Sequence, residues 1–126
     1  MIKYYLIILL VFFGRHSFAQ MERRIAFGLL DTSVVTVAEF NQQNGLRTKE
    51  DYLIDSAIVF FSGYNFPNVR RVAFYPQYDS LKFSEYRKII APGSVVIFSI
   101  FLRNKSTNKI IETQLNYLFI PPKPDY

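Results

Sequence analysis

The side chains in this sequence that could carry out acid–base chemistry are carboxylates. Two carboxylates on either side of a glycosidic bond can hydrolyse it, provided that the fold sets their separation. Solvated surface charge is the simpler interpretation of most of them. Asp55 differs because it interrupts an apolar face of a predicted strand, where we expect it to have hydrogen-bond partners. The acidic residues weighed for this role are Glu39, Glu50, Asp51, Asp55, Asp79, Glu85 and Glu112.

The residue types needed for most other catalytic and metal chemistry are missing. The sequence has no cysteine, and its single histidine, His16, lies in an N-terminal segment with the plan of a signal peptide. Ser-His-Asp and Cys-His catalysis and the usual zinc, copper and iron sites depend on these two residue types. The five glycines are spread out and form no phosphate-binding loop. We therefore expect no enzyme activity, no catalytic residue, no cofactor and no metal site.

The N-terminus has the three parts of a secretory signal peptide. Lys3 supplies the positive charge, residues 4–13 form an unbroken apolar run, and Ser17 and Ala19 are small residues shortly before Gln20. The apolar run is too short to span a bilayer, which takes about 20 residues. We expect cleavage after Ala19, which defines residues 1–19 as the signal peptide. The mature chain should then be periplasmic or secreted, without a membrane span.

Residues 20–120 are expected to form one β-domain, followed by a Pro-rich tail at residues 121–126. Because the chain has no cysteine, an exported domain of this size must rely on its hydrophobic core for stability. The formal net charge is +5, of which Lys3 and Arg15 belong to the leader, and the remaining basic residues are mostly scattered. This charge pattern argues against nucleic-acid binding.

The stretch from Ser94 to Arg103 is the clearest strand signal in the chain. It is rich in β-branched and aromatic residues, and it follows Pro92 and Gly93, which favour a turn. Both of its faces are apolar, so we expect it in the middle of a sheet with both sides covered. One face carries Val96, Phe98, Ile100 and Leu102, and the other carries Val95, Ile97, Ser99 and Phe101.

The remaining segments predict an all-β fold. Short β-rich runs separated by turn residues favour a β-sandwich of the immunoglobulin-like kind, with about six to seven strands. One segment changes to a helical spacing of apolar residues, which predicts a short helix over 81–90. The closing strand has a polar face and should therefore be wet on one side. The other expected strands are 25–30, 34–40, 52–61, 69–75 and 110–120.

The order of these elements resembles the C-terminal domain of the gliding-motility/type IX secretion protein M family. The resemblance covers roughly Val34 to Ile120 and implies an immunoglobulin-like sandwich in the cell envelope that acts by protein contact. In that family the domain ends a shaft between an inner-membrane motor and outer-membrane components. This sequence has no counterpart of the family's anchor or upstream domains, so a free-standing adaptor is expected. The resemblance rests on YLIDSAIVFFSG at 52–63, the helical segment 84–90, Pro92-Gly93-Ser94 with its strand, and Leu118-Phe119-Ile120.

A partner-binding patch is predicted around the loop that precedes the strand 69–75. Exposed aromatic and arginine side chains are typical of interaction hot spots, and we hypothesise that they bind an envelope protein or another copy of the chain. The alternative is that the loop folds its aromatic residues back over the end of the sandwich. The predicted patch consists of Tyr64, Phe66, Arg70, Arg71 and Tyr75.

Three classes of function therefore remain open. The first is an exported, non-catalytic interaction domain of the cell envelope, which the missing catalytic residues favour. The second is a small secreted carbohydrate-binding module that uses Tyr64 and Phe66 as a platform. The third is a two-carboxylate glycosidase, which the short length of the chain disfavours.

Overall fold

The computed structural model describes residues 24–122. The predicted signal peptide and most of the predicted tail lie outside these residues. Strands make up 52% of the described residues and helices 13%, so the fold is mostly β. The elements in chain order are β1 (Ile25–Phe27), β2 (Val34–Val35), α2 (Val37–Asn41), β3 (Leu46–Thr48), β4 (Tyr52–Gly63), β5 (Phe66–Tyr75), α3 (Ser80–Arg87), β6 (Ser94–Asn104) and β7 (Ile110–Phe119).

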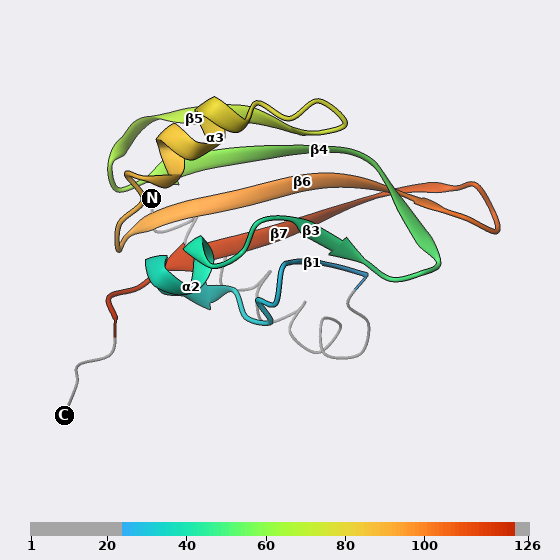
Figure 1. The fold of residues 1–126 in the computed structure, drawn as a ribbon, viewed down its shortest axis with the longest axis horizontal. Coiled ribbons are helices and arrows are strands. Elements are labelled where there is room, and N and C mark those ends of the chain that lie inside the picture. Colours follow the sequence, from blue (N-terminus) through green and yellow to red (C-terminus); the bar gives the residue numbers. More distant parts are fainter. Residues whose placement is uncertain (1–23, 123–126) are drawn as a thin grey trace, which may run out of the picture.

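Five strands form one twisted sheet in the order β2-β7-β6-β4-β5 (Figure 1). All neighbours are antiparallel except the short pair of β2 and β7, which is parallel. β6 is the middle strand, as its two apolar faces predict. Register places Phe98 opposite Val59 on β4 and opposite Leu115 on β7. Within residues 24–122 there are seven strands in two sheets, which confirms the prediction of an all-β fold with six to seven strands.

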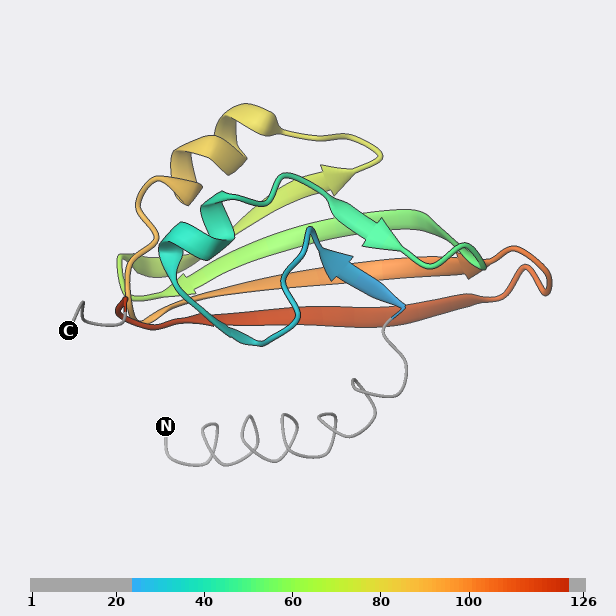
Figure 2. The same cartoon turned by 60° about the horizontal axis from the view of Figure 1, so that its bottom comes forward.

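The second layer lies on one side of the large sheet (Figure 2). It consists of the two-stranded sheet β1-β3 together with α2 and α3. Phe27 from β1 stacks at a centroid distance of 4.8 Å on Phe98 from β6, and Phe83 from α3 lies 5.7 Å from Phe61 on β4. This side, the covered face, holds the core. Its fully buried large side chains are Phe27, Phe40, Phe61, Phe83, Phe98, Phe119, Ile100 and Leu102.

The prediction of a strand over 34–40 is wrong beyond its first two residues. The chain turns at Thr36 into α2, because Thr36 and Glu39 form a capping box. The Thr36 hydroxyl accepts a hydrogen bond from the Glu39 N–H at 3.2 Å, and the Glu39 carboxylate accepts one from the Thr36 N–H at 2.8 Å. These two bonds satisfy N–H groups that an isolated helix start leaves unpaired. Residues 24–122 therefore contain two short helices where one was expected.

The predicted loop of residues 62–68 is instead a tight β-turn between β4 and β5. Tyr64 and Asn65 are the only residues between the two strands. Gly63 has φ +81°, and a Cβ there would lie 2.6 Å from the carbonyl oxygen of Gly93. Glycine thus allows the turn to sit against the Gly93 turn that leads into β6. Consequently Phe66 belongs to a strand and faces the core.

The helix predicted over 81–90 is present as α3. It begins one residue earlier, because the carboxylate of Asp79 accepts a hydrogen bond from the N–H of Lys82 at 3.1 Å and caps the first turn. Among residues 24–122, no helix is long and apolar enough to cross a membrane.

Candidate interaction surface

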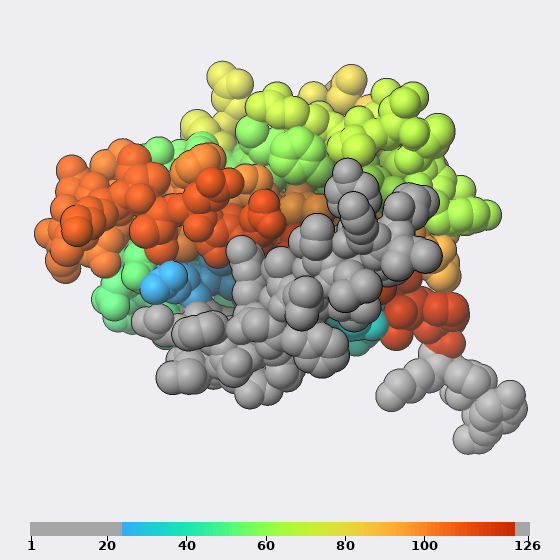
Figure 3. Space-filling model, turned by 180° about the vertical axis from the view of Figure 1, so that it is seen from behind, coloured from blue at the N-terminus to red at the C-terminus, as the bar shows by residue number. Residues whose placement is uncertain are grey.

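The side of the large sheet that faces away from α2, α3, β1 and β3 is the open face (Figures 2 and 3). No element of residues 24–122 lies over it. Successive residues of a strand point to opposite faces of the sheet, and residues paired across neighbouring strands point to the same face. The strand pairing therefore identifies the side chains of the open face. They are Val34 (β2), Leu53, Asp55, Ser56, Ile58, Phe60 and Ser62 (β4), Val69, Arg71 and Ala73 (β5), Val95, Ile97, Ser99, Phe101 and Arg103 (β6), and Ile110, Glu112, Gln114, Asn116 and Leu118 (β7).

An apolar band crosses the open face from β2 to β4. Leu118 pairs with both Val34 and Val95, and one step along β6 Ile97 pairs with Phe60. Val34 is 48% exposed and Leu118 is 39% exposed, while the other three are partly buried by their neighbours in the sheet. Phe101, further along β6, is 38% exposed. Large apolar side chains in such a continuous arrangement mark interaction surfaces more often than scattered exposed residues do.

Charged groups on the open face flank the apolar band. Arg103 donates hydrogen bonds to Oδ1 of Asp55 from Nη2 at 2.9 Å and from Nε at 3.3 Å. Its Nη1 also donates to the side-chain oxygen of Asn108 at 3.1 Å. The expectation that Asp55 has hydrogen-bond partners is therefore confirmed. On β7, Glu112 accepts a long hydrogen bond of 3.5 Å from Ser99, and Arg71 lies on the opposite edge strand.

The five residues of the predicted patch do not form one surface. Phe66 is 5% exposed and stacks on Phe61, so it is a core residue. Arg70 lies over the ring of Tyr86 from α3, on the covered face, whereas Arg71 pairs with Phe60 on the open face.

The two tyrosines of the predicted patch lie at opposite ends of β5. Tyr64 precedes the strand and Tyr75 ends it, which separates them by roughly 30 Å at 3.3 Å per residue. Both side chains are exposed. Of the five residues, Arg71 lies among the apolar side chains of β4 and β6, so the prediction that all five form one patch around the loop is wrong.

The sequence did contain the signal for the open face. Both faces of residues 94–103 are apolar, and from this pattern we expected both faces of the strand to be covered by other parts of the protein. One covering layer is present within residues 24–122, and it leaves Val95, Ile97 and Phe101 facing outward. The same pattern of two apolar strand faces thus predicts either a buried strand or a strand with a docking face.

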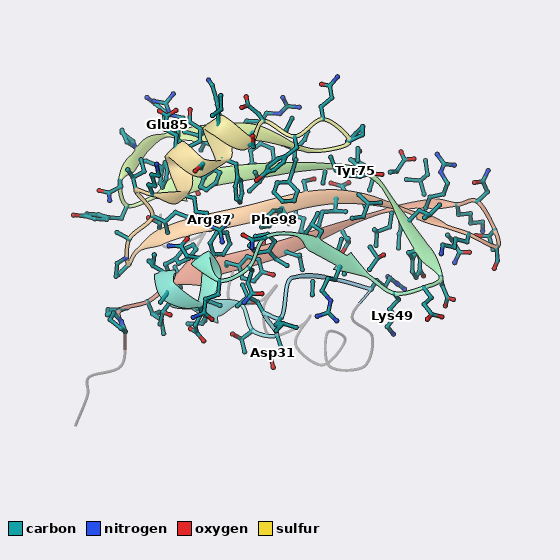
Figure 4. The ribbon with its side chains drawn as sticks, viewed as in Figure 1. Asp31, Lys49, Tyr75, Glu85, Arg87 and Phe98 are labelled. Atoms are coloured by element: carbon teal, nitrogen blue, oxygen red, sulfur yellow. The ribbon has the colours of Figure 1, made fainter. Side chains whose placement is uncertain are left out.

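Arg87 is a charged side chain on the covered side that is held by several contacts. It ends α3 and reaches α2, where Nε donates to Oδ1 of Asn41 at 2.9 Å and Nη2 donates to the carbonyl of Phe40 at 2.7 Å. Nη2 also donates to the carbonyl of Gln43. Figure 4 shows Arg87 between the two helices.

Aromatic rings surround this guanidinium. Its carbon lies 5.2 Å from the ring centroid of Phe40, 5.5 Å from that of Phe83 and 5.9 Å from that of Phe27. Burial lowers the pKa of Arg87, and nearby Tyr78 partly opposes that change. An arginine remains protonated under such conditions. Arg87 therefore acts as a structural connection between α2 and α3.

The depression beside Arg87 has a volume of about 240 Å³ and is lined by Asn41, Ser84, Arg87 and Lys88. No carboxylate lines it. Within the described residues there is also no group of three or more acidic or histidine side chains able to hold a metal ion. The open face is consequently the best candidate for a functional surface.

Comparison of the chain with protein-family models, with curated proteins and with solved structures finds no match.

Proposed function

We propose that this protein is an exported, non-catalytic interaction domain of the bacterial cell envelope that binds its partner through the open face. The observation that carries the proposal is the apolar band across a sheet face over which no described element lies. A sheet face of this kind is stable in water only at the cost of exposing apolar area, about 25 cal/mol for each Å². A partner that covers it recovers that free energy.

Export and location are part of the same proposal. The three-part pattern of residues 1–19 supports cleavage by a signal peptidase and a periplasmic or secreted location. The resemblance to the type IX secretion protein M domain supports an immunoglobulin-like adaptor that works by contact. The absence of cysteine and of any histidine after His16 supports a role without catalysis.

A carbohydrate-binding module is the second candidate. Tyr64 is 62% exposed and could stack on a sugar ring. However, Phe66, its expected companion, is buried, which leaves no aromatic platform at that end of β5. The open face offers a much larger apolar surface, and apolar area of this size favours a protein partner over a sugar.

Two arginines placed on the open face test the proposal. From cells that also produce an untagged copy of the chain, we expect the tagged wild type to co-purify a partner, either an envelope protein or the untagged copy. The Phe101→Arg/Leu118→Arg variant should lose this partner, since two charges would have to be desolvated in the interface. The control is Leu81→Arg, which changes an 83% exposed leucine on α3. All three proteins should give cooperative melting transitions when dilute, because exposed substitutions rarely cost more than about 0.5 kcal/mol.

Recovery of the same proteins with all three forms would contradict a docking role of the open face. Binding to a glycan array that disappears in Tyr64→Ala, with an unchanged set of co-purifying proteins, would support the carbohydrate-binding module instead.

A further inference from the structure

We infer that the occupant of the open face is a second copy of this chain, packed sheet against sheet. This inference rests on the proposed function, because both use the same surface. Face-to-face packing places two sheets about 10 Å apart with their side chains interdigitated. A partner packed in this way presents a sheet face of similar extent, which a second copy does by symmetry.

The size of the open face fits a stable dimer. β6 has 11 residues, which at 3.3 Å per residue gives a length of about 36 Å. The four long strands β4 to β7 span about 20 Å at 4.8 Å per strand. The face thus measures roughly 700 Å², close to the approximately 800 Å² that each partner contributes to a standard interface.

The charges of the open face also favour a copy of itself. Two basic and two acidic side chains lie on it in the described strands, so it carries no net charge: Arg71, Arg103, Asp55 and Glu112. A neutral face has no electrostatic preference for a strongly charged partner and does not repel its own kind.

The apolar band gives this interface its core. Phe60 and Ile97 are neighbours near the middle of the sheet, with Val95 and Leu118 beside them towards β7. The polar side chains of Gln114 and Asn116 lie on β7, nearer the edge. An apolar centre with a polar rim is the usual composition of a specific protein interface.

Sedimentation of the exported chain tests the inference. From about 1 to about 100 µM, the wild type should shift to twice the monomer mass, and its melting temperature should rise with concentration, because association stabilises the folded form by mass action. Phe101→Arg/Leu118→Arg should dissociate at least about tenfold more readily, with a melting temperature that does not depend on concentration. Leu81→Arg should behave as the wild type.

Cross-linking provides a second readout that does not depend on a loss of association. The chain has no cysteine, so Ser99→Cys introduces a single thiol in the middle of the open face, and Ser80→Cys introduces one on α3 as the matched control. A bismaleimide with a spacer of about 10 Å, the separation of packed sheets, should join two chains through residue 99 and not through residue 80.

A wild type that stays monomeric at about 100 µM would overturn the inference, as would cross-linking through residue 80 with none through residue 99. If such a monomer still recovers a different protein that Phe101→Arg/Leu118→Arg loses, the proposed function stands and the second copy is excluded. If the Phe101→Arg/Leu118→Arg variant changes neither self-association nor the set of co-purifying proteins, both the second copy and the docking role of the open face are overturned.

Discussion

Replacing Phe98 with aspartate is expected to abolish the cooperative unfolding transition of the protein. Phe98 is fully buried at the middle of β6, with the rings of Phe27, Phe74 and Tyr117 at centroid distances of 4.8, 5.3 and 6.2 Å. None of these ring contacts can compensate a buried carboxylate. An unpaired buried charge costs several kcal/mol, comparable with the whole stability of 5–15 kcal/mol of a typical domain. Circular dichroism during heating measures the transition.

Phe101→Asp is the matched control for this experiment. It makes the same change on the same strand, three residues further on, where the side chain lies on the open face. The new carboxylate would stand directly opposite Glu112, so we expect a loss of up to about 1 kcal/mol and a retained cooperative transition. If both variants melted like the wild type, the position of Phe98 at the centre of the core would be wrong.

Replacing Arg87 with methionine should lower the free energy of unfolding by about 2–4 kcal/mol. Methionine keeps the apolar contact with the surrounding rings but removes every donor. Three hydrogen bonds to Asn41, Phe40 and Gln43 are then lost, and two carbonyl oxygens lose a charged donor. Hydrogen bonds to charged groups contribute roughly 1.5–3 kcal/mol each, reduced here because water reaches the partly buried carbonyls. Urea denaturation measures the difference.

Arg70→Met serves as the comparison for Arg87→Met. Arg70 also lies over an aromatic ring, at 6.0 Å from the centroid of Tyr86, but its side chain is exposed. An exposed cation–π contact contributes about 0.5–1 kcal/mol, so the loss should not exceed that value. Equal losses for the two variants would contradict the role of Arg87 as the connection between α2 and α3.

The strands were predictable from the sequence where hydrophobic pattern alone decides. Residues 94–103 show two apolar faces, and β6 is the middle strand of the sheet. The polar residues on one face of the closing strand predicted that this face is exposed to solvent. Glu112 and Gln114 are exposed, whereas Tyr117 and Phe119 on the other face are buried. The burial of these residues follows from the spacing of apolar residues along each strand and from the residue types, both of which can be read directly from the sequence.

The prediction failed where the local structure depends on a few hydrogen bonds or where burial depends on a segment distant in the sequence. The β-branched residues after Val34 favour a strand, but the capping box of Thr36 and Glu39 starts a helix at Val37. Phe66 follows turn residues, and its burial depends on the rings of Phe61 and Tyr86. A contact with Tyr86, twenty residues further along the chain, is not visible in local sequence.

The most direct test of the docking role of the open face is site-specific photo-cross-linking in the cells that produce the protein. A benzophenone amino acid replaces Phe101 on the open face or Leu81 on α3, and illumination is followed by mass spectrometry of the adducts. Both positions are exposed, so the reagent itself is tolerated at either. We predict a protein adduct from position 101 and none from position 81. No protein adduct at position 101, or equal adducts at both positions, would contradict the account.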